Sequence, residues 1–503
     1  MNNKKGEIES VDQVSINAAE KPTIQYRQGE LDRMFDEAES ALAATGRVYH
    51  RGGALVSLTD DGRTFALSPP SVLILLARAA CWVRKTRNEE GDAVIKKVDP
   101  PMAVAAAMPK ASEWKTLPEL FHVVDHPLFL AETGELLARG YDSKSKFFGN
   151  FRPLQSVNID ANLDDAKKAE AYIQKLFETL DLETDADRAA ALCAVLTAVS
   201  RPALRTAPMF LVTAPVIGSG KGMFARLVSN FASAGEPPAK TLQGDEDEIK
   251  KELISALLTG APVLFFDEVR GSEIDSPSLR TLSTSETLSG RLLGTNKDVN
   301  LSTRTLVFVT GNNVSPSADT ARRMLEIRLN PRCENPATRK FKVDPIKFAR
   351  ENRSTLIRAA LTIQAAYSNY LKAGGAEPDI SGAGSFPEWN SWCRLPVCWL
   401  TGQDPAERLL AQLKSDPQKV ELGEVLVEWQ REFGDKAVTS GEVCKVQKLY
   451  DSIRAVASAR NRDLSAGEVG RWLAKNKDRI VNGKKLEKSL SITSVAKWRV
   501  VSL

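Results

Sequence analysis

The chain has 503 residues, of which 43% are hydrophobic and 26% charged, and its net charge is +4. A single hydrophobic core stops growing at roughly 250–300 residues, so this length predicts about three domains. The near-average composition excludes a disordered tail protein. The longest apolar stretch, Ser71–Val83, is too short for a bilayer span, and no apolar segment of a secretory signal follows the first residues. We expect a folded cytoplasmic protein.

The cysteines and histidines predict neither disulfides nor a zinc site. Six cysteines are spread over the chain without a C-x-x-C pair, and there are three histidines. Zinc and redox sites show close Cys or His spacing. We interpret the cysteines as reduced thiols.

The N-terminal third divides into two parts. Residues 1–30 are polar and unpatterned, which predicts a disordered tail. Residues 31–160 mix short strand-like runs, turn signals and a helical run from Pro70 to Val83, which predicts an N-terminal α+β domain. The basic stretch Arg84–Arg87 is interpreted as a charged loop, with DNA contact or a collar as alternatives.

The middle of the chain predicts an α/β core over residues 161–345. Two helical segments come first, and the apolar runs Met209–Thr213, Val263–Phe266 and Leu306–Thr310 follow. Runs of branched and aromatic residues without polar alternation are typical of parallel strands covered on both faces. Residues 346–436 turn helical again and are expected to form a helical lid and connector.

The last segment, 437–503, carries 14 Lys/Arg against 6 Asp/Glu, a net charge of +8 that leaves −4 for the rest of the chain. Ser465 and Glu468 form a capping-box pattern, and Asn482-Gly483 predicts a hairpin turn between RIV and WRVV. Helices followed by a hairpin predict a basic winged helix, which binds DNA or docks a protein. The expected DNA contacts are Arg471, Lys475 and Lys477 on the recognition helix and Lys484, Lys485 and Lys488 on the wing.

One segment, MFLVTAPVIGSGKGMFARLVS, predicts a phosphate-binding loop. Backbone N–H groups and a helix N-terminus hold phosphates in such a loop, and Lys221 would reach the outer ones. Against the pattern G-x-x-x-x-G-K-[ST], Pro215 replaces the first glycine and Gly222 replaces the hydroxyl residue that binds Mg²⁺. The candidate nucleotide contacts are Gly218, Ser219, Gly220, Lys221 and Gly222. A plain surface loop is the alternative.

Three later elements supply the remaining chemistry of nucleotide hydrolysis. Asp267-Glu268 ends an apolar strand, so one carboxylate can hold Mg²⁺ while the next activates water. Asn312 follows another strand and can position that water. Arg322 and Arg323 are expected to open a helix and to stabilise the transferring phosphate across a subunit boundary. Taken singly, a solvated acidic turn, turn chemistry and a structural salt bridge explain these residues equally well. Together they predict ATP hydrolysis.

This order resembles the AAA+ ATPases related to superfamily 3 helicases, namely replicative helicases and primase-associated ATPases of bacterial mobile elements and prophages. The resemblance covers about 162–405, through RPALRTAPMFLVTAPVIGSGKG, LLTGAPVLFFDEVRG and SGRLLGTNKDVNLSTRTLVFVTGNN. It implies a P-loop AAA+ core with a helical lid. By this resemblance Lys221 is the Walker A lysine, Asp267 and Glu268 are Walker B with Asp267 on Mg²⁺, Asn312 is the sensor, and Arg322 or Arg323 is the finger.

The resemblance also implies a homo-hexamer whose channel loops grip single-stranded DNA. The matching loop, Ser289–Ser302, carries Lys297 at its centre and Arg291 as support, with an exposed hairpin as the alternative. The implied function is an ATP-dependent helicase that acts on single-stranded or forked DNA during replication of a mobile element or prophage, with any primase a separate protein. An origin-binding initiator or helicase loader that uses ATP as an assembly switch is the alternative. A protein-remodelling machine is disfavoured because Gly294–Asp298 lacks an aromatic residue.

Overall fold

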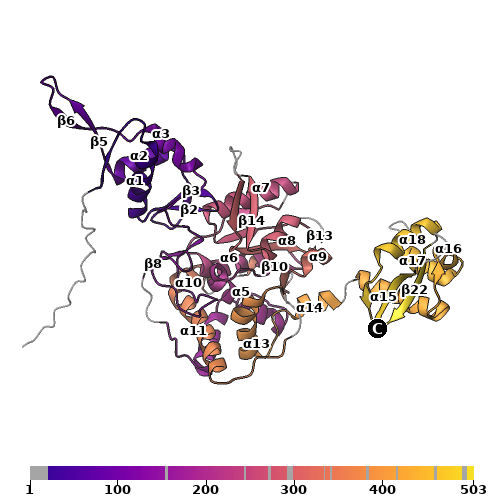
Figure 1. Cartoon of the computed structure of the whole chain (residues 1–503). Coiled ribbons are helices and arrows are strands. Elements are labelled where there is room, and N and C mark those ends of the chain that lie inside the picture. Colours follow the sequence, from indigo (N-terminus) through magenta and orange to yellow (C-terminus); the bar gives the residue numbers. More distant parts are fainter. Residues whose placement is uncertain are drawn as a thin grey trace, which may run out of the picture. The chain divides into compact units, whose positions relative to one another are not determined.

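The chain forms two compact units, Met1–Ala406 and Glu407–Leu503, shown in Figure 1. The computed structural model describes residues 21–152, 157–242, 245–269, 273–291, 298–333, 335–339, 343–380, 385–414, 417–457, 462–489 and 496–503. The division after Ala406 falls inside the range 346–436, which the sequence analysis assigns to a helical lid and connector. No helix within these ranges is long and apolar enough to cross a membrane.

The first unit is built on a five-stranded parallel sheet with the order β11-β12-β16-β10-β18. Its strands are β10 (Met209–Ala214), β11 (Ala239–Lys240), β12 (Val263–Phe266), β16 (Leu306–Asn312) and β18 (Met324–Arg328). The three strands predicted from apolar runs are therefore confirmed. Their uniform burial is that of a sheet covered on both faces.

Alternate strand residues point to opposite faces of this sheet. On one face Leu211, Phe266 and Val309 share a core with α7 (Glu246–Thr259) and α8 (Pro277–Thr284). On the other face the rings of Phe210 and Phe224 both lie against that of Phe308. Phe224 belongs to α6 (Lys221–Ala232).

Helices complete the first unit around this sheet. The two predicted helices that precede the sheet are α4 (Leu163–Gln174) and α5 (Asp185–Ser200), and each begins with a capping box. The long helix α11 (Arg353–Lys372) packs along α4. The other helices are α9 (Ala318–Ala321), α10 (Pro345–Glu351), α12 (Pro387–Trp389) and α13 (Leu395–Thr401). Two small pairings lie beside the main sheet, β13 (Glu273–Ile274) with β17 (Ser315–Pro316) and β14 (Thr287–Arg291) with β15 (Asp298–Ser302).

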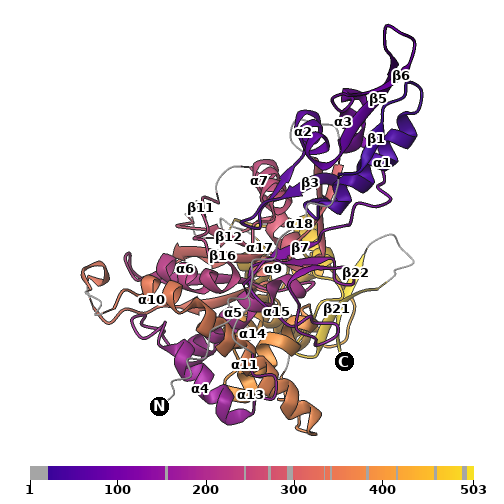
Figure 2. The ribbon, with the colours of Figure 1, turned by 90° about the vertical axis from the view of Figure 1, so that its left-hand side faces the viewer.

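The N-terminal part of this unit mixes helices and strands, as predicted. Its elements are β1 (Thr23–Gln25), α1 (Leu31–Ala44), β2 (Val48–Arg51), β3 (Ala54–Leu58), β4 (Thr64–Ala66), α2 (Pro69–Ala79), β5 (Cys81–Arg87), β6 (Ala93–Lys97), α3 (Met102–Ala107), β7 (His122–Val124), β8 (Gly140–Asp142) and β9 (Phe147–Gly149). Three expectations were wrong here. The range 1–30 predicted as a disordered tail includes β1, which pairs with β5 and buries Ile24. The helical run stops at Ala79, and the basic stretch Arg84–Arg87 is a strand, because β5 pairs with both β1 and β6. The ribbon formed by β5 and β6 projects from the N-terminal part of the unit in Figures 1 and 2.

The second unit packs helices on a four-stranded sheet with the order β19-β22-β21-β20. Its elements are α14 (Glu407–Lys414), α15 (Pro417–Phe433), β19 (Val438–Thr439), α16 (Ser440–Val443), α17 (Gln447–Ala457), α18 (Ala466–Lys475), β20 (Ile480–Val481), β21 (Lys484–Ser489) and β22 (Lys497–Ser502). The predicted capping box of α18 is confirmed. The Asn482-Gly483 turn is also confirmed, but it joins β20 to β21, and β21 in turn pairs with the WRVV strand β22.

Candidate functional site

The functional side chains of the first unit gather at one edge of its parallel sheet. All pairings of this sheet are parallel, so the carboxyl ends of β10, β12 and β16 lie at the same edge, where open α/β sheets bind ligands. Lys221 opens α6 after β10, Asp267-Glu268 follow β12, and Asn312 ends β16. The structure therefore brings these four sequence-predicted residues together.

The loop before Lys221 has the backbone of an anion cradle. Gly218 and Gly220 adopt φ values of 76° and 94°, which residues with a side chain rarely adopt. The Ser219 hydroxyl donates to the Val216 carbonyl at 2.5 Å. This bond uses the Ser219 side chain inside the loop, so backbone N–H groups and the N-terminus of α6 are left to meet an anion.

Lys221 is a buried cation held by the predicted sensor residue. Its Nζ donates to Oδ1 of Asn312 at 2.6 Å, and the residue is 7% exposed. Burial lowers the pKa of Lys221, and the nearby Asp267 and Glu268 carboxylates oppose this shift. Asn312 thus positions the ammonium group rather than standing free at the end of its strand.

The acidic pair is held by Thr310, a residue to which the sequence analysis assigned no role. The buried Thr310 hydroxyl donates to Oδ1 of Asp267 at 2.6 Å and accepts from the Glu268 amide at 3.0 Å. The backbone at Glu268 has φ 51°, which is uncommon outside glycine and marks a constrained position. The neighbouring amide of Val269 donates to the Thr310 carbonyl at 2.8 Å. One threonine therefore holds the Asp267 carboxylate and the backbone of Glu268.

The residues present fit a magnesium ion that is shared with a nucleotide. A Cβ built on Gly222 would lie 3.5 Å from each carboxylate oxygen of Asp267. Gly222, which replaces the hydroxyl residue of the loop pattern, therefore faces Asp267, the predicted Mg²⁺ ligand. Mg²⁺ usually takes one or two carboxylates, several waters and substrate phosphates, so Asp267 can serve without a protein hydroxyl.

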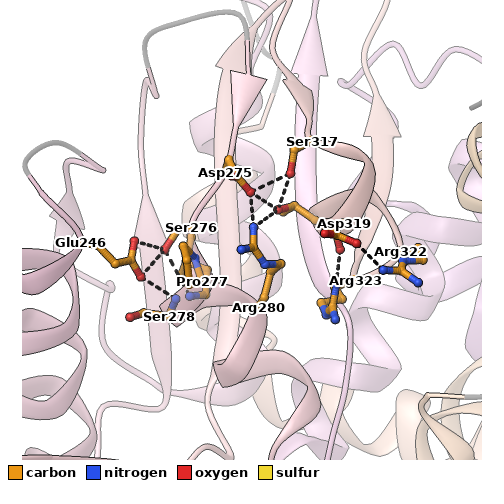
Figure 3. Close-up of polar contacts among 12 residues, drawn as sticks. Glu246, Asp275, Ser276, Pro277, Ser278, Arg280, Ser317, Asp319, Arg322 and Arg323 are labelled. Carbon is orange, nitrogen blue, oxygen red and sulfur yellow. Dashed lines mark hydrogen bonds and ion pairs between the residues drawn. The ribbon is translucent and has the colours of Figure 1, made fainter. Parts of the chain in front are cut away.

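The predicted arginines occupy a turn, which corrects the expectation that they open a helix (Figure 3). They follow the four-residue α9 and lead into β18, because pairing with β10 imposes an extended backbone from Met324 onward. Arg322 forms an ion pair with Asp319, and side-chain exposures are 54% and 67%. Arg323 donates to the Asp319 carbonyl, and burial lowers its pKa. The buried Nε of Arg323 has no hydrogen-bond partner among the described residues.

These arginines lie at the sheet edge opposite to Lys221. The Met209 amide, at the start of β10, donates to the Arg323 carbonyl at 2.8 Å, whereas Lys221 follows the end of β10. The six residues of β10 span about 17 Å at about 3.3 Å per residue. Neither arginine is therefore placed to contact a phosphate held by its own Lys221.

A polar network joins the two segments that leave the site and run to the arginine turn (Figure 3). The Ser317 hydroxyl donates to Oδ1 of Asp275 at 2.8 Å and thereby lowers the pKa of Asp275. Arg280 forms an ion pair with Asp275. The carboxylate of Glu246 accepts from the Ser276 hydroxyl at 3.0 Å. The chain after the acidic pair and the chain after Asn312 are thus fastened side by side.

The predicted channel loop has the form of a hairpin. Strands β14 and β15 pair antiparallel, and Arg291 opposite Asp298 is the last pair before the tip. Arg291 is exposed. Residues 292–297, which include Lys297, lie outside the described residues.

Some of the basic residues predicted to contact DNA in the second unit already have a partner within the chain, and others do not. Arg471 and Lys475 are exposed and one turn apart on α18. Neither forms an ion pair with another described residue, and the same holds for the half-buried Lys484. Lys485 is paired with Glu487 at 2.8 Å. Lys477 pairs with Asp478 at 3.3 Å, and Lys488 lies over the Trp498 ring.

Comparisons with known proteins give only distant similarities. No protein-family model and no curated protein match the sequence. One similar solved structure is the apo A form of the NrS-1 C-terminal region, at 10% identity and a TM-score of 0.41, covering 92% of this chain and 99% of that chain. Another is JCV helicase with a bound thiazolopyridine acetamide, at 13% identity and a TM-score of 0.25, covering 54% and 65%. At these values the case for a function rests on the geometry of the site.

Proposed function

We propose that the chain is an ATP-driven DNA helicase with a P-loop AAA+ core, which assembles as a ring and translocates on single-stranded DNA. The observation that carries this proposal is the single sheet edge at which Lys221 bonds Asn312 and Thr310 bonds both Asp267 and the amide of Glu268. A lysine, an amide and two positioned carboxylates beside a glycine-rich loop are the groups that phosphoryl transfer to water requires.

The residues divide the chemistry of ATP hydrolysis between them. The loop amides and Lys221 hold the phosphates, and Asp267 would hold Mg²⁺, which would supply positive charge to the phosphates when bound. Glu268 orients a water molecule and takes its proton as the water oxygen bonds to the γ-phosphorus. The bond from the γ-phosphorus to the bridging oxygen breaks, and ADP leaves with that oxygen. Asn312 keeps Lys221 aligned during this step.

The arginine turn supports assembly as a ring. Arg322 and Arg323 lie at the sheet edge away from their own Lys221, so they can act only on a nucleotide bound by another copy. The exposed ion pair of Arg322 with Asp319 is worth about 0–1 kcal/mol, so a neighbouring phosphate can displace Asp319 easily. A head-to-tail contact of this kind builds a ring when the rotation between copies closes, and we propose that the ring is a homo-hexamer.

Two surfaces would bind DNA in this proposal. The hairpin β14–β15 would project Lys297 into the ring channel toward the phosphate backbone of a single strand. The second unit would be a winged helix that presents Arg471 and Lys475 on α18 to forked DNA. Within this unit, residues 437–503 carry a net charge of +8, which supports nucleic-acid binding.

A forked-DNA unwinding assay with and without ATP tests this function. Wild type should displace a strand only with ATP, Lys221→Ala should lose nucleotide binding or turnover, and Lys297→Ala should lose DNA-stimulated hydrolysis and unwinding. Hydrolysis that does not respond to single-stranded DNA, together with no strand displacement, would refute the proposal. Loss of basal hydrolysis in Lys297→Ala would refute the hairpin assignment alone.

A second candidate function is an origin-binding initiator or helicase loader that uses ATP as an assembly switch. The observation that favours it is the separate compact unit 407–503 with its exposed basic helix. Sequence-specific protection of origin DNA together with absent unwinding would favour this function. Binding without any sequence preference would exclude it.

A further inference from the structure

The tight turn between β2 and β3 touches the middle of the hairpin β14–β15. Gly52 and Gly53 form the two-residue turn between β2 and β3, with φ values of 55° and 83°. The Asn300 amide, on β15, donates to the Gly52 carbonyl at 3.3 Å. Across the hairpin, Ser289 Oγ donates to Oδ1 of Asn300 at 3.1 Å. The turn therefore bonds the outer edge of β15, three residues from Lys297.

This contact leaves no room for a side chain at Gly52. A Cβ built there would lie 2.5 Å from the Asn300 carbonyl oxygen and 2.6 Å from Cδ2 of Leu301. A Cβ on Gly53 would meet nothing within 4 Å. Only one of two adjacent glycines in the same turn is thus pressed against the hairpin.

The β2–β3 turn is anchored in the core that covers one face of the five-stranded sheet. Ala54, directly after the turn, is buried in the same core cluster as Leu258 and Leu301. The Thr64 hydroxyl, on β4, donates to the Leu258 carbonyl at 3.1 Å. Strands β2 and β3 lie beside α7 in Figure 1.

A buried arginine strengthens this anchor. Arg51 Nη1 donates to Oγ1 of Thr64 at 3.3 Å, and the residue is 3% exposed. Burial lowers the pKa of Arg51 to about 10. Its guanidinium packs against Gly260 at the C-terminal end of α7, where the helix dipole favours a cation. No carboxylate of the described residues pairs with Arg51, and its Nε has no hydrogen-bond partner among them.

The opposite strand of the hairpin is held by α7. A Cβ on Gly290, in β14, would lie 2.7 Å from Cγ1 of Ile254. The hairpin is thus held on β14 by α7, at Gly290, and on β15 by the β2–β3 turn, at Asn300. We propose that Gly52 is a positioning residue for the hairpin, and that the β2–β3 turn fixes where strands β14 and β15 lie on the sheet and thereby supports the response of ATP hydrolysis to DNA. The inference rests on the proposed helicase function.

The matched variants Gly52→Ala and Gly53→Ala, in the full chain, test this role. Both place a Cβ at positive φ and share that strain, but only Gly52→Ala must displace Asn300. Amide exchange at Asn300 should rise about tenfold in Gly52→Ala, the effect of losing about one hydrogen bond, and stay at the wild-type value in Gly53→Ala. DNA-stimulated ATP hydrolysis should fall in Gly52→Ala, while basal hydrolysis matches that of Gly53→Ala.

Equal exchange at Asn300 in the two variants, or an equal loss of DNA stimulation, would overturn the inference. If wild type hydrolyses ATP without responding to DNA, the helicase proposal fails, and the exchange comparison still decides whether the turn holds the hairpin. Should Gly52→Ala not fold, Thr64→Val removes the hydroxyl that joins Arg51 to α7 and should reduce DNA stimulation in the same direction. Thr64→Ser keeps that hydroxyl and is its control.

Discussion

Removal of the buried hydroxyl of Thr310 should uncouple the acidic pair, which follows β12, from the neighbouring strand β16. Thr310→Val keeps the shape of the side chain but deletes the donor to Asp267 and the acceptor of the Glu268 amide, at 2.6 and 3.0 Å. Among the described residues the Thr310 hydroxyl bonds Asp267 and Glu268, whereas Lys221 is held by Asn312, so phosphate binding should remain. The variant therefore separates the placement of the carboxylates from the binding of ATP.

The size of the effect follows from the bond to Asp267. A hydrogen bond to a charged group contributes about 1.5–3 kcal/mol. If this free energy is lost in the transition state, kcat should fall about 10- to 150-fold, at about 1.4 kcal/mol per factor of ten. The Glu268 amide also loses its acceptor, which adds to the effect.

Steady-state ATP hydrolysis of wild type, Thr310→Val and Thr310→Ser measures this effect. Thr310→Ser retains the hydroxyl and should keep a kcat close to wild type, while KM for ATP should change little in either variant. A wild-type kcat in Thr310→Val would show that the hydroxyl does not position the carboxylates. A large rise in KM without a change in kcat would place Thr310 in nucleotide binding instead.

Three further predictions concern the metal, the ring and the second unit. Gly222→Ser should lower the Mg²⁺ concentration that half-saturates ATP hydrolysis by about tenfold, the scale of single changes around a metal. The reason is that a Cβ at position 222 lies 3.5 Å from the Asp267 carboxylate oxygens. An unchanged Mg²⁺ titration would contradict this geometry. Mixing Arg322→Ala or Arg323→Ala subunits with Lys221→Ala subunits should restore part of the ATP hydrolysis, whereas no recovery with either arginine variant would indicate a structural role. Hydrogen bonds of the α18 cap lower the pKa of Glu468 to about 2, so the cap stabilises α18 above pH 4.5 and this stability is lost as pH falls toward 2. Amide-exchange protection of α18, corrected for intrinsic rates, should show that loss in wild type and not in Glu468→Gln.

Local patterns in the sequence were enough to predict three of the five strands of the main sheet and the order of the chemical groups. The runs at β10, β12 and β16 are apolar over their whole length, which is the signature of a parallel sheet buried on both faces. Groups at the ends of parallel strands share one edge, so Lys221 and Asn312 could be expected near one another without knowing any distance. The capping box of Ser465 and Glu468 and the Asn482-Gly483 turn were equally readable, because each depends on a few adjacent residues.

The tertiary structure alone decided the contacts that join distant segments. A threonine inside an apolar strand carries no local sign of its partners, so the role of Thr310 became visible only when β16 was placed beside β12. The turn at Arg322 and its separation from Lys221 depend on β18 pairing with β10, which no helical pattern near the arginines could reveal. Gly52 looks like any turn glycine in the sequence. Its fit against Asn300 exists because packing brings together residues far apart in the chain, and short-range propensity carries no information about such contacts.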